Sequence, residues 1–93
     1  MYERVLRRMR QNVRALTYVM TTHAEEEMED DGLTILDVEH VVLTGRIVES
    51  QRDRLTAQRK YVVSGQTEAG ENAEVIGRLS AHGKLVILTI YRA

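Results

Sequence analysis

The sequence predicts an α+β fold of two layers, with N-terminal helices packed on one face of a four- to five-stranded antiparallel sheet. Two observations predict it. Apolar residues recur at helical spacing in the first half, and short strand-like runs separated by turn-prone segments fill the second half. A chain of 93 residues without a linker is expected to form a single domain, residues 1–93.

A first helix is expected over residues 3–14, so that residues 1–14 form an N-terminal extension. On a helical wheel its apolar side chains form a stripe about 100° wide, which must pack on another element. The stripe consists of Tyr2, Val5, Leu6, Met9, Val13 and Leu16. The outward Arg7, Arg8 and Arg14 are candidate partner-binding residues, and a face that meets only water is the alternative.

A short strand or extended connector is expected at residues 16–21, followed by a helix over 22–31. Thr22 and Glu25 have the spacing of a capping box, and Gly32 suits the residue after the last turn.

A third helix is expected over residues 34–44. Thr34 is its predicted N-cap with Asp37 three residues later, and Gly45 is predicted to end it.

The remaining residues predict four strands joined by short turns, at 46–50, 60–65, 73–80 and 84–92. In the last strand Val86, Leu88 and Ile90 form a purely apolar face, which we expect to lie under the helices. The other face carries Thr89 and Tyr91 and is expected to be open to a ligand.

Charge is strongly segregated along the chain, although the net charge is only −1. Residues 1–14 hold five arginines and one glutamate, whereas residues 15–45 hold eight acids and no lysine or arginine. Such blocks indicate electrostatic steering or partner binding, unless the two segments lie together and neutralise each other.

Several kinds of chemistry are excluded or lack a motif. The absence of cysteine excludes disulfides and thiolate metal sites. There is no glycine-rich phosphate loop and no His-Glu-x-x-His motif, so we expect neither a cofactor nor a metal. No apolar run approaches the roughly 18 residues of a membrane helix, and the N-terminus lacks the apolar region of a signal peptide. A cytoplasmic protein without membrane contact is therefore expected.

His23 is the strongest candidate for chemistry. It lies at the start of the second predicted helix, and residues 25–31, which follow after one alanine, are acidic at six of seven positions. The helix dipole disfavours the imidazolium there, so a neutral imidazole that acts as a base is one interpretation. A histidine that only hydrogen-bonds the strand below it is the other.

The run TTHAEEEMEDDGLTILDVEHVVLTGRIVES, residues 21–50, resembles a small bacterial family of domains of unknown function. That family is usually grouped with RelE-, BrnT- and MqsR-like toxins, and its pattern is T-x-H-A-x-x-R-M-x-x-R-G, ending in a Thr-x-Tyr strand. The matching residues are Thr21, His23, Ala24, Met28, Gly32, Leu33, Thr34, Val38, Gly45, Thr89 and Tyr91.

The resemblance implies a RelE-like fold and a toxin of a bacterial toxin–antitoxin system. Such proteins are endoribonucleases or ribosome-associated RNA-binding proteins that a partner antitoxin neutralises. On this hypothesis His23 and Tyr91 are catalytic. The substrate-binding residues would be Arg59, Lys60, Thr89 and Arg92.

Two positions depart from the family pattern, because Glu27 and Asp31 stand where it has arginine. Their spacing places both carboxylates along one helical stripe with His23. Carboxylates repel phosphate, so we expect weak or absent ribonuclease activity.

A non-enzymatic protein-binding module and a homodimer on the same fold are the alternative functions. If Arg59, Lys60 and Arg92 converge with His23 in one concavity, the enzyme hypothesis gains support. If they lie apart, the binding hypothesis is favoured.

Overall fold

The computed structural model describes residues 1–93, which form three helices and five strands. The helices are α1 (Glu3–Ala15), α2 (Thr22–Asp30) and α3 (Ile35–Thr44). The strands are β1 (Tyr18–Met20), β2 (Arg46–Arg52), β3 (Arg59–Gln66), β4 (Asn72–Leu79) and β5 (Leu85–Arg92). No helix is long and apolar enough to cross a membrane.

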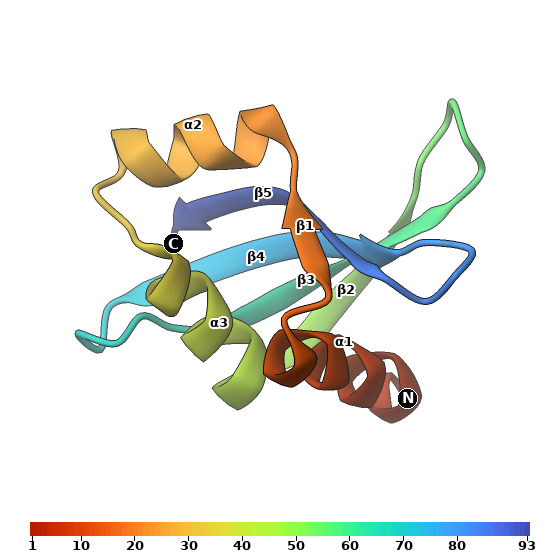
Figure 1. Ribbon diagram of the computed structural model, residues 1–93, viewed down its shortest axis with the longest axis horizontal. Helices are drawn as coiled ribbons and strands as arrows, with labels where there is room; N and C mark the ends of the chain where they lie inside the picture. Colours follow the sequence, from red (N-terminus) through yellow and green to blue (C-terminus); the bar gives the residue numbers. More distant parts are fainter.

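The strands form one sheet in the order β1-β5-β4-β3-β2, and the helices pack against it (Figure 1). The predicted two-layer α+β fold is therefore confirmed. The sheet is mixed rather than wholly antiparallel, because β1 pairs in parallel with residues 85–87 of β5. The connector expected at residues 16–21 thus contains a short edge strand.

Local signals set the helix ends, with one correction. Thr34 and Asp37 form the predicted capping box of α3, and Gly32 takes a φ of 66° after α2. The box predicted for Thr22 and Glu25 is wrong, since the N-cap of α2 is Thr21, whose hydroxyl accepts the backbone N–H of Ala24 at 3.1 Å. Thr21 is still extended and next to β5, so the helix can begin only at the following residue.

The core lies between the helices and one face of the sheet. α3 contributes Val38, Val41 and Val42, which are fully buried with Val63 and Val75 of the sheet. At about 25 cal/mol per Å², burying such side chains supplies most of the stability of a small domain.

A β-bulge in β5 overturns the predicted burial of that strand. Ile76 pairs with Thr89 but Gly77 pairs with Ile87, so Leu88 is an extra residue in β5. The bulge shifts the alternation by one residue. Leu85 and Ile87 are buried before it and Ile90 after it. Val86 and Leu88, predicted to lie under the helices, are only half-buried.

The buried side chain of Asn12 attaches α1 to the turn between β4 and β5. Its Nδ2 donates to the carbonyls of Arg8 and Gly83, both at 2.9 Å. Its Oδ1 accepts the backbone N–H of Leu85 at 3.1 Å and the hydroxyl of Thr17 at 2.9 Å. Because every polar atom of this amide is satisfied, it orients α1 specifically.

Candidate functional site on the open face of the sheet

The sheet face away from the core is formed by two rows of cross-strand neighbours. One row runs Tyr91, Glu74, Ser64, Arg46, and the next runs Thr89, Ile76, Val62, Glu49. Paired residues on neighbouring strands project to the same side of a sheet. Val62 is buried although it lies outside the core cluster under the helices, so this open face has an apolar floor.

Tyr91 lies among three carboxylates. Its hydroxyl donates to the carboxylate of Glu74. This hydrogen bond, then burial, then the charges of Glu74, Glu49 and Glu27 raise the pKa of Tyr91 to about 12. The phenol is therefore protonated at neutral pH and is not a base. We call Glu27, Glu49, Glu74 and Tyr91 the acidic end of the open face.

His23 lies at the margin of this acidic end. Its Nε2 is 3.2 Å from Oε1 of Glu27, one helical turn later on α2. The His23 side chain is 67% exposed, against 28% for Glu27. This geometry leaves the imidazole accessible to a partner and in contact with the Glu27 carboxylate.

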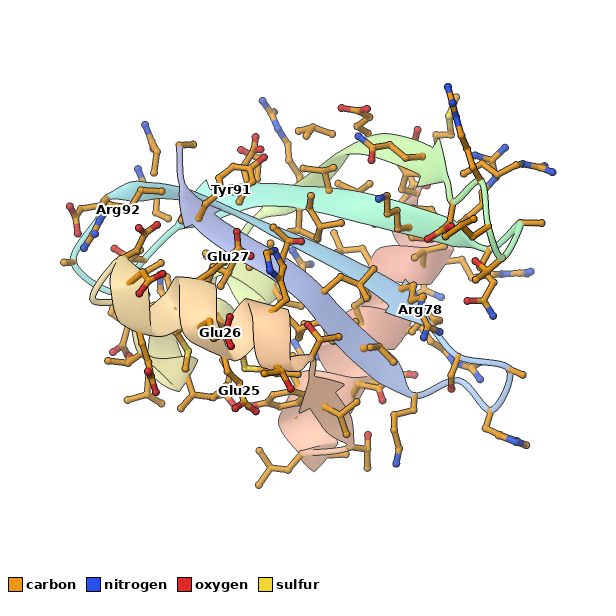
Figure 2. The ribbon with its side chains drawn as sticks, turned by 90° about the horizontal axis from the view of Figure 1, so that it is seen from above. Glu25, Glu26, Glu27, Arg78, Tyr91 and Arg92 are labelled. Atoms are coloured by element: carbon orange, nitrogen blue, oxygen red, sulfur yellow. The ribbon has the colours of Figure 1, made fainter.

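α2 covers the edge of β5 that β1 leaves unpaired. The Thr21 hydroxyl donates to the carbonyl of Leu88 at 3.3 Å. Glu27 then accepts the backbone N–H of Ile90 at 3.3 Å, and Asp31 accepts that of Arg92 at 3.2 Å. Figure 2 shows α2 beside β5, with Glu27 directed toward the strand.

The spacing of the two acids matches that of the two amides. Four residues of helix advance about 6 Å, and two residues of strand advance about 6.6 Å. Glu27 and Asp31 can therefore each meet one outward N–H of β5. Glu27 and Asp31, the two positions that depart from the resembled pattern, thus cap the backbone N–H groups at the edge of the sheet. An uncapped edge could pair with a strand of another chain.

The predicted substrate-binding residues do not converge on His23. Arg59 points to the helix side, where it donates to the Ser50 hydroxyl at 2.9 Å and lies near α1. Arg92 donates to the backbone carbonyl of Asp31 and forms an ion pair with Glu71 at 3.4 Å. Both arginines are thus engaged away from the open face. Of the predicted substrate-binding residues, Thr89 and Lys60 lie on that face, together with the predicted catalytic Tyr91.

Lys60 lies at the other end of the open face, together with Arg78. Both charges lower the pKa of Asp53, after the larger effect of the backbone N–H groups of Leu55 and Thr56. In Figure 2 Arg78 lies at the end of the sheet remote from Tyr91 and Glu27. The open face is therefore polarised, with a basic end of Lys60 and Arg78.

Glu49, Glu74 and Arg78 were not singled out from the sequence. Glu74 and Arg78 occupy outward positions in the strand AEVIGRL, where polar and apolar residues partly alternate. That alternation is the signal that could have identified them. No group of three or more His, Asp or Glu side chains is arranged to hold a metal ion.

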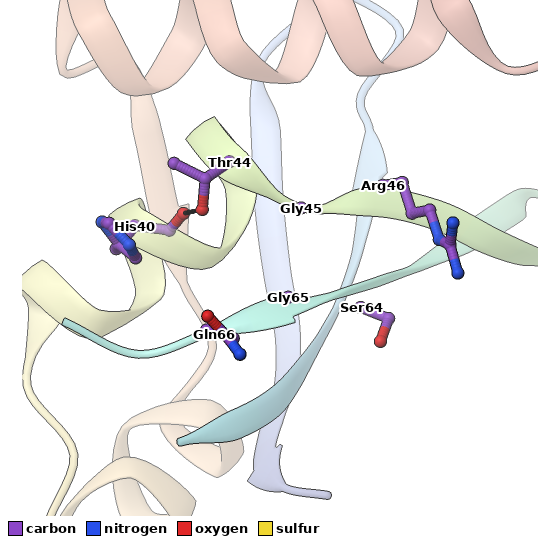
Figure 3. Close-up of a pocket in the computed structure, with 7 residues that line it drawn as sticks. All are labelled: His40, Thr44, Gly45, Arg46, Ser64, Gly65 and Gln66. Atoms are coloured by element: carbon purple, nitrogen blue, oxygen red, sulfur yellow. Dashed lines mark hydrogen bonds between the residues drawn. The ribbon is translucent and has the colours of Figure 1, made fainter. Parts of the chain in front are cut away.

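A polar hollow of about 390 Å³ adjoins the Arg46 end of the open face (Figure 3). It is lined by His40, Thr44, Gly45, Arg46, Ser64, Gly65 and Gln66. Gly45 lies so close to neighbouring backbone that a Cβ on it would lie 2.5 Å from the carbonyl oxygens of Ser64 and Val41. The hollow has no apolar side chain, which makes it a poor site for an organic ligand.

Comparison with known proteins gave one match. A family model described as Domain of unknown function (DUF4258) matches residues 20–92. The match begins at the last residue of β1 and does not include α1. No curated protein and no solved structure matched significantly.

Proposed function

The chain belongs to the DUF4258 family, and from this premise and the geometry of its open face we propose that it is a protein-binding module on a toxin-like fold. A basic segment of a partner protein lies on the acidic end. The observation that carries the proposal is the contact of the Glu74 carboxylate with the Tyr91 hydroxyl, with the charges of Glu49 and Glu27 near enough to act on the same phenol, while Arg59 and Arg92 are engaged elsewhere.

The acidic end has the chemistry to receive a lysine or arginine side chain. Its carboxylates attract a cation, and the neighbouring Val62 and Ile76 offer an apolar floor for the aliphatic stem. A phosphate at the same place would meet three like charges. Binding there should therefore favour a basic polypeptide over RNA.

An antitoxin is the partner class that the resemblance to RelE-, BrnT- and MqsR-like toxins favours. In this proposal the chain belongs to a toxin–antitoxin-type pair in bacteria, and its association with the partner does not require nuclease activity. A homodimer, in which the acidic end receives a basic surface of a second copy, is the alternative occupant.

Titration of the labelled protein with a short peptide of alternating lysine and alanine tests the proposal. Backbone amide signals of Glu74, Ile76, Thr89 and Tyr91 should shift together as the peptide binds. The double variant Glu49→Gln with Glu74→Gln should weaken binding at low salt, because two attractive charges are lost.

The matched control is Glu29→Gln with Glu68→Gln, which removes the same charge from exposed positions off the open face. Equal weakening by the two double variants would mean that the peptide senses only net charge. Shifts confined to α2 would place the partner on the helix rather than on the sheet. Either result contradicts the proposal.

Ribonuclease activity on the open face is the second candidate function, favoured by Lys60 and Arg78 at its basic end, which is remote from Tyr91. These cations would hold phosphate groups of the RNA. At the acidic end, the Glu74 carboxylate would accept a proton and the Tyr91 phenol would donate one. Incubation with a defined RNA tests this. If the native chain cleaves the RNA and both Glu74→Gln and Lys60→Gln abolish cleavage, ribonuclease activity replaces the binding proposal. If His23→Ala also abolishes cleavage, the histidine takes part in the reaction.

A further inference from the structure

The outward face of α1 carries four arginines against one carboxylate, Glu3, which is paired with the N-terminal ammonium group. Arg4, Arg7, Arg8 and Arg14 are all exposed, and none takes part in an ion pair. Arg10 differs, because it donates to the carbonyls of Val42 and Gly45 and so attaches α1 to the end of α3. The four outward guanidinium groups are free to bind a ligand.

The acidic segment does not neutralise these arginines. α1 packs mainly on α3, whereas α2 packs on β5. Figure 1 shows α1 and α2 on opposite sides of the molecule. The segregation of charge along the sequence therefore persists in space, and an external anion would meet little competition from the chain's own acids.

The turn between β4 and β5 extends the basic surface. The guanidinium of Arg8 lies over Gly83, close enough that a Cβ there would be 2.5 Å from its Nη2. Beside it is a hollow of about 490 Å³ that has no acidic residue in its lining. The lining is Arg8, Gln11, Asn12, Ala15, Thr17, His82, Gly83 and Lys84. Three basic side chains thus border one polar hollow.

We propose that this surface binds the phosphate backbone of a nucleic acid. We define the arginine surface as Arg4, Arg7, Arg8 and Arg14 of α1 with His82 and Lys84 of the turn. Guanidinium groups present several N–H donors in a plane, which suits phosphate oxygens. The 13 residues of α1 extend about 20 Å, so the helix can follow several consecutive phosphates.

Binding on the arginine surface should be independent of base sequence. No aromatic side chain belongs to it, so it lacks a platform on which bases could stack. Its cations contact only the backbone, which gives affinity and a strong salt dependence but no readout of bases. The surface lies outside the residues matched by the family model and acts independently of the acidic end.

The test is fluorescence anisotropy of the full chain with a labelled single-stranded RNA long enough to span α1. The variant Arg7→Gln/Arg8→Gln/Arg14→Gln should reduce the slope of log K against log salt by about 2, because each phosphate contact contributes about 0.7 for single strands. At roughly 0.1 M salt the same change corresponds to about 100-fold weaker binding. Circular dichroism should show unchanged folding.

The matched control is Arg46→Gln/Arg52→Gln/Arg54→Gln, which removes three exposed arginines outside α1. This control variant should leave the slope of log K against log salt nearly unchanged. A variant with lysine in place of the three α1 arginines should retain most of the native slope. A duplex DNA of equal length distinguishes whether RNA or DNA is preferred, and binding of either supports the proposal.

The proposal is overturned if the α1 variant binds RNA and DNA as the native chain does, or if the control variant weakens binding equally. It is also overturned if the α1 variant changes only self-association in sedimentation experiments, since the arginines would then meet the acids of a second copy. Binding of the basic peptide to the acidic end should be unaffected in the α1 variant. Failure here is therefore distinguishable from failure of the proposed function.

Discussion

Replacing Glu27 by arginine should destabilise the fold, although it restores the residue type of the pattern that the sequence resembles. Oε1 of Glu27 accepts the backbone N–H of Ile90, a residue that is fully buried. Arginine has only donors and cannot replace that acceptor. The variant would leave an amide of the β5 edge without a partner.

The size of the effect follows from burial and distance. A buried donor left without an acceptor costs about 1–3 kcal/mol. The native bond is 3.3 Å long, beyond the usual range, so the loss should fall in the lower half, about 1–2 kcal/mol. The contact with His23 adds little because that side chain is 67% exposed.

Urea unfolding followed by circular dichroism measures this difference. With an m value of about 2 kcal/mol/M, the midpoint should fall by about 0.5–1 M. Glu27→Gln retains a carbonyl acceptor, so its urea midpoint should fall clearly less than that of Glu27→Arg.

Glu26→Arg is the matched control, because Glu26 is exposed and adjacent on the same acidic helix. Both arginine variants relieve repulsion within the acidic run by a similar few tenths of a kcal/mol. The difference between them therefore isolates the bond to Ile90. Equal urea midpoints for the two variants would refute the role of Glu27 at the strand edge. Glu27 would then contribute only its charge to the acidic end.

Three further changes test the fold. Asn12→Ala removes four hydrogen bonds of a buried amide and should cost at least about 2 kcal/mol by urea unfolding, whereas a loss below about 1 kcal/mol would mean that water replaces the side chain. The backbone N–H of Thr34 holds the pKa of Asp37 below its usual range, so the stabilisation by Asp37 is complete above about pH 4 and is lost as the pH falls through the lower folded pKa. The gap between native and Asp37→Asn midpoints should consequently narrow toward about pH 2, and a constant gap would contradict this linkage. Gly45→Ala places a Cβ 2.5 Å from the carbonyl oxygens of both Ser64 and Val41 and should cost about 1–3 kcal/mol in the same assay, whereas an unchanged midpoint would contradict this close approach.

For the candidate site, the sequence identified His23, Glu27 and Tyr91 but not what surrounds them. Their prominence came from spacing within one helix and from the end of one strand, which are local properties. Glu74 joins Tyr91 only because β4 and β5 pair in one register. Arg59 and Arg92 belong to the predicted site only through the family resemblance, and the tertiary structure directs both away from the open face.

Elements whose signals lie within a few residues of each other could be predicted from the sequence alone. Thr34 and Asp37 start α3 and Gly32 follows α2, because caps and left-handed residues act through bonds to adjacent turns.

Features that depend on contacts between distant strands could not be predicted in this way. The extra residue Leu88 in β5 reversed the predicted face of that strand before the bulge, since a register is a property of two strands and not of one. The parallel pairing of β1 left part of β5 without a neighbouring strand. The acidic run of α2, which the sequence presents as a charged face, therefore supplies Glu27 and Asp31 as acceptors for the amides of that edge, because unpaired backbone groups must be satisfied wherever the fold places them.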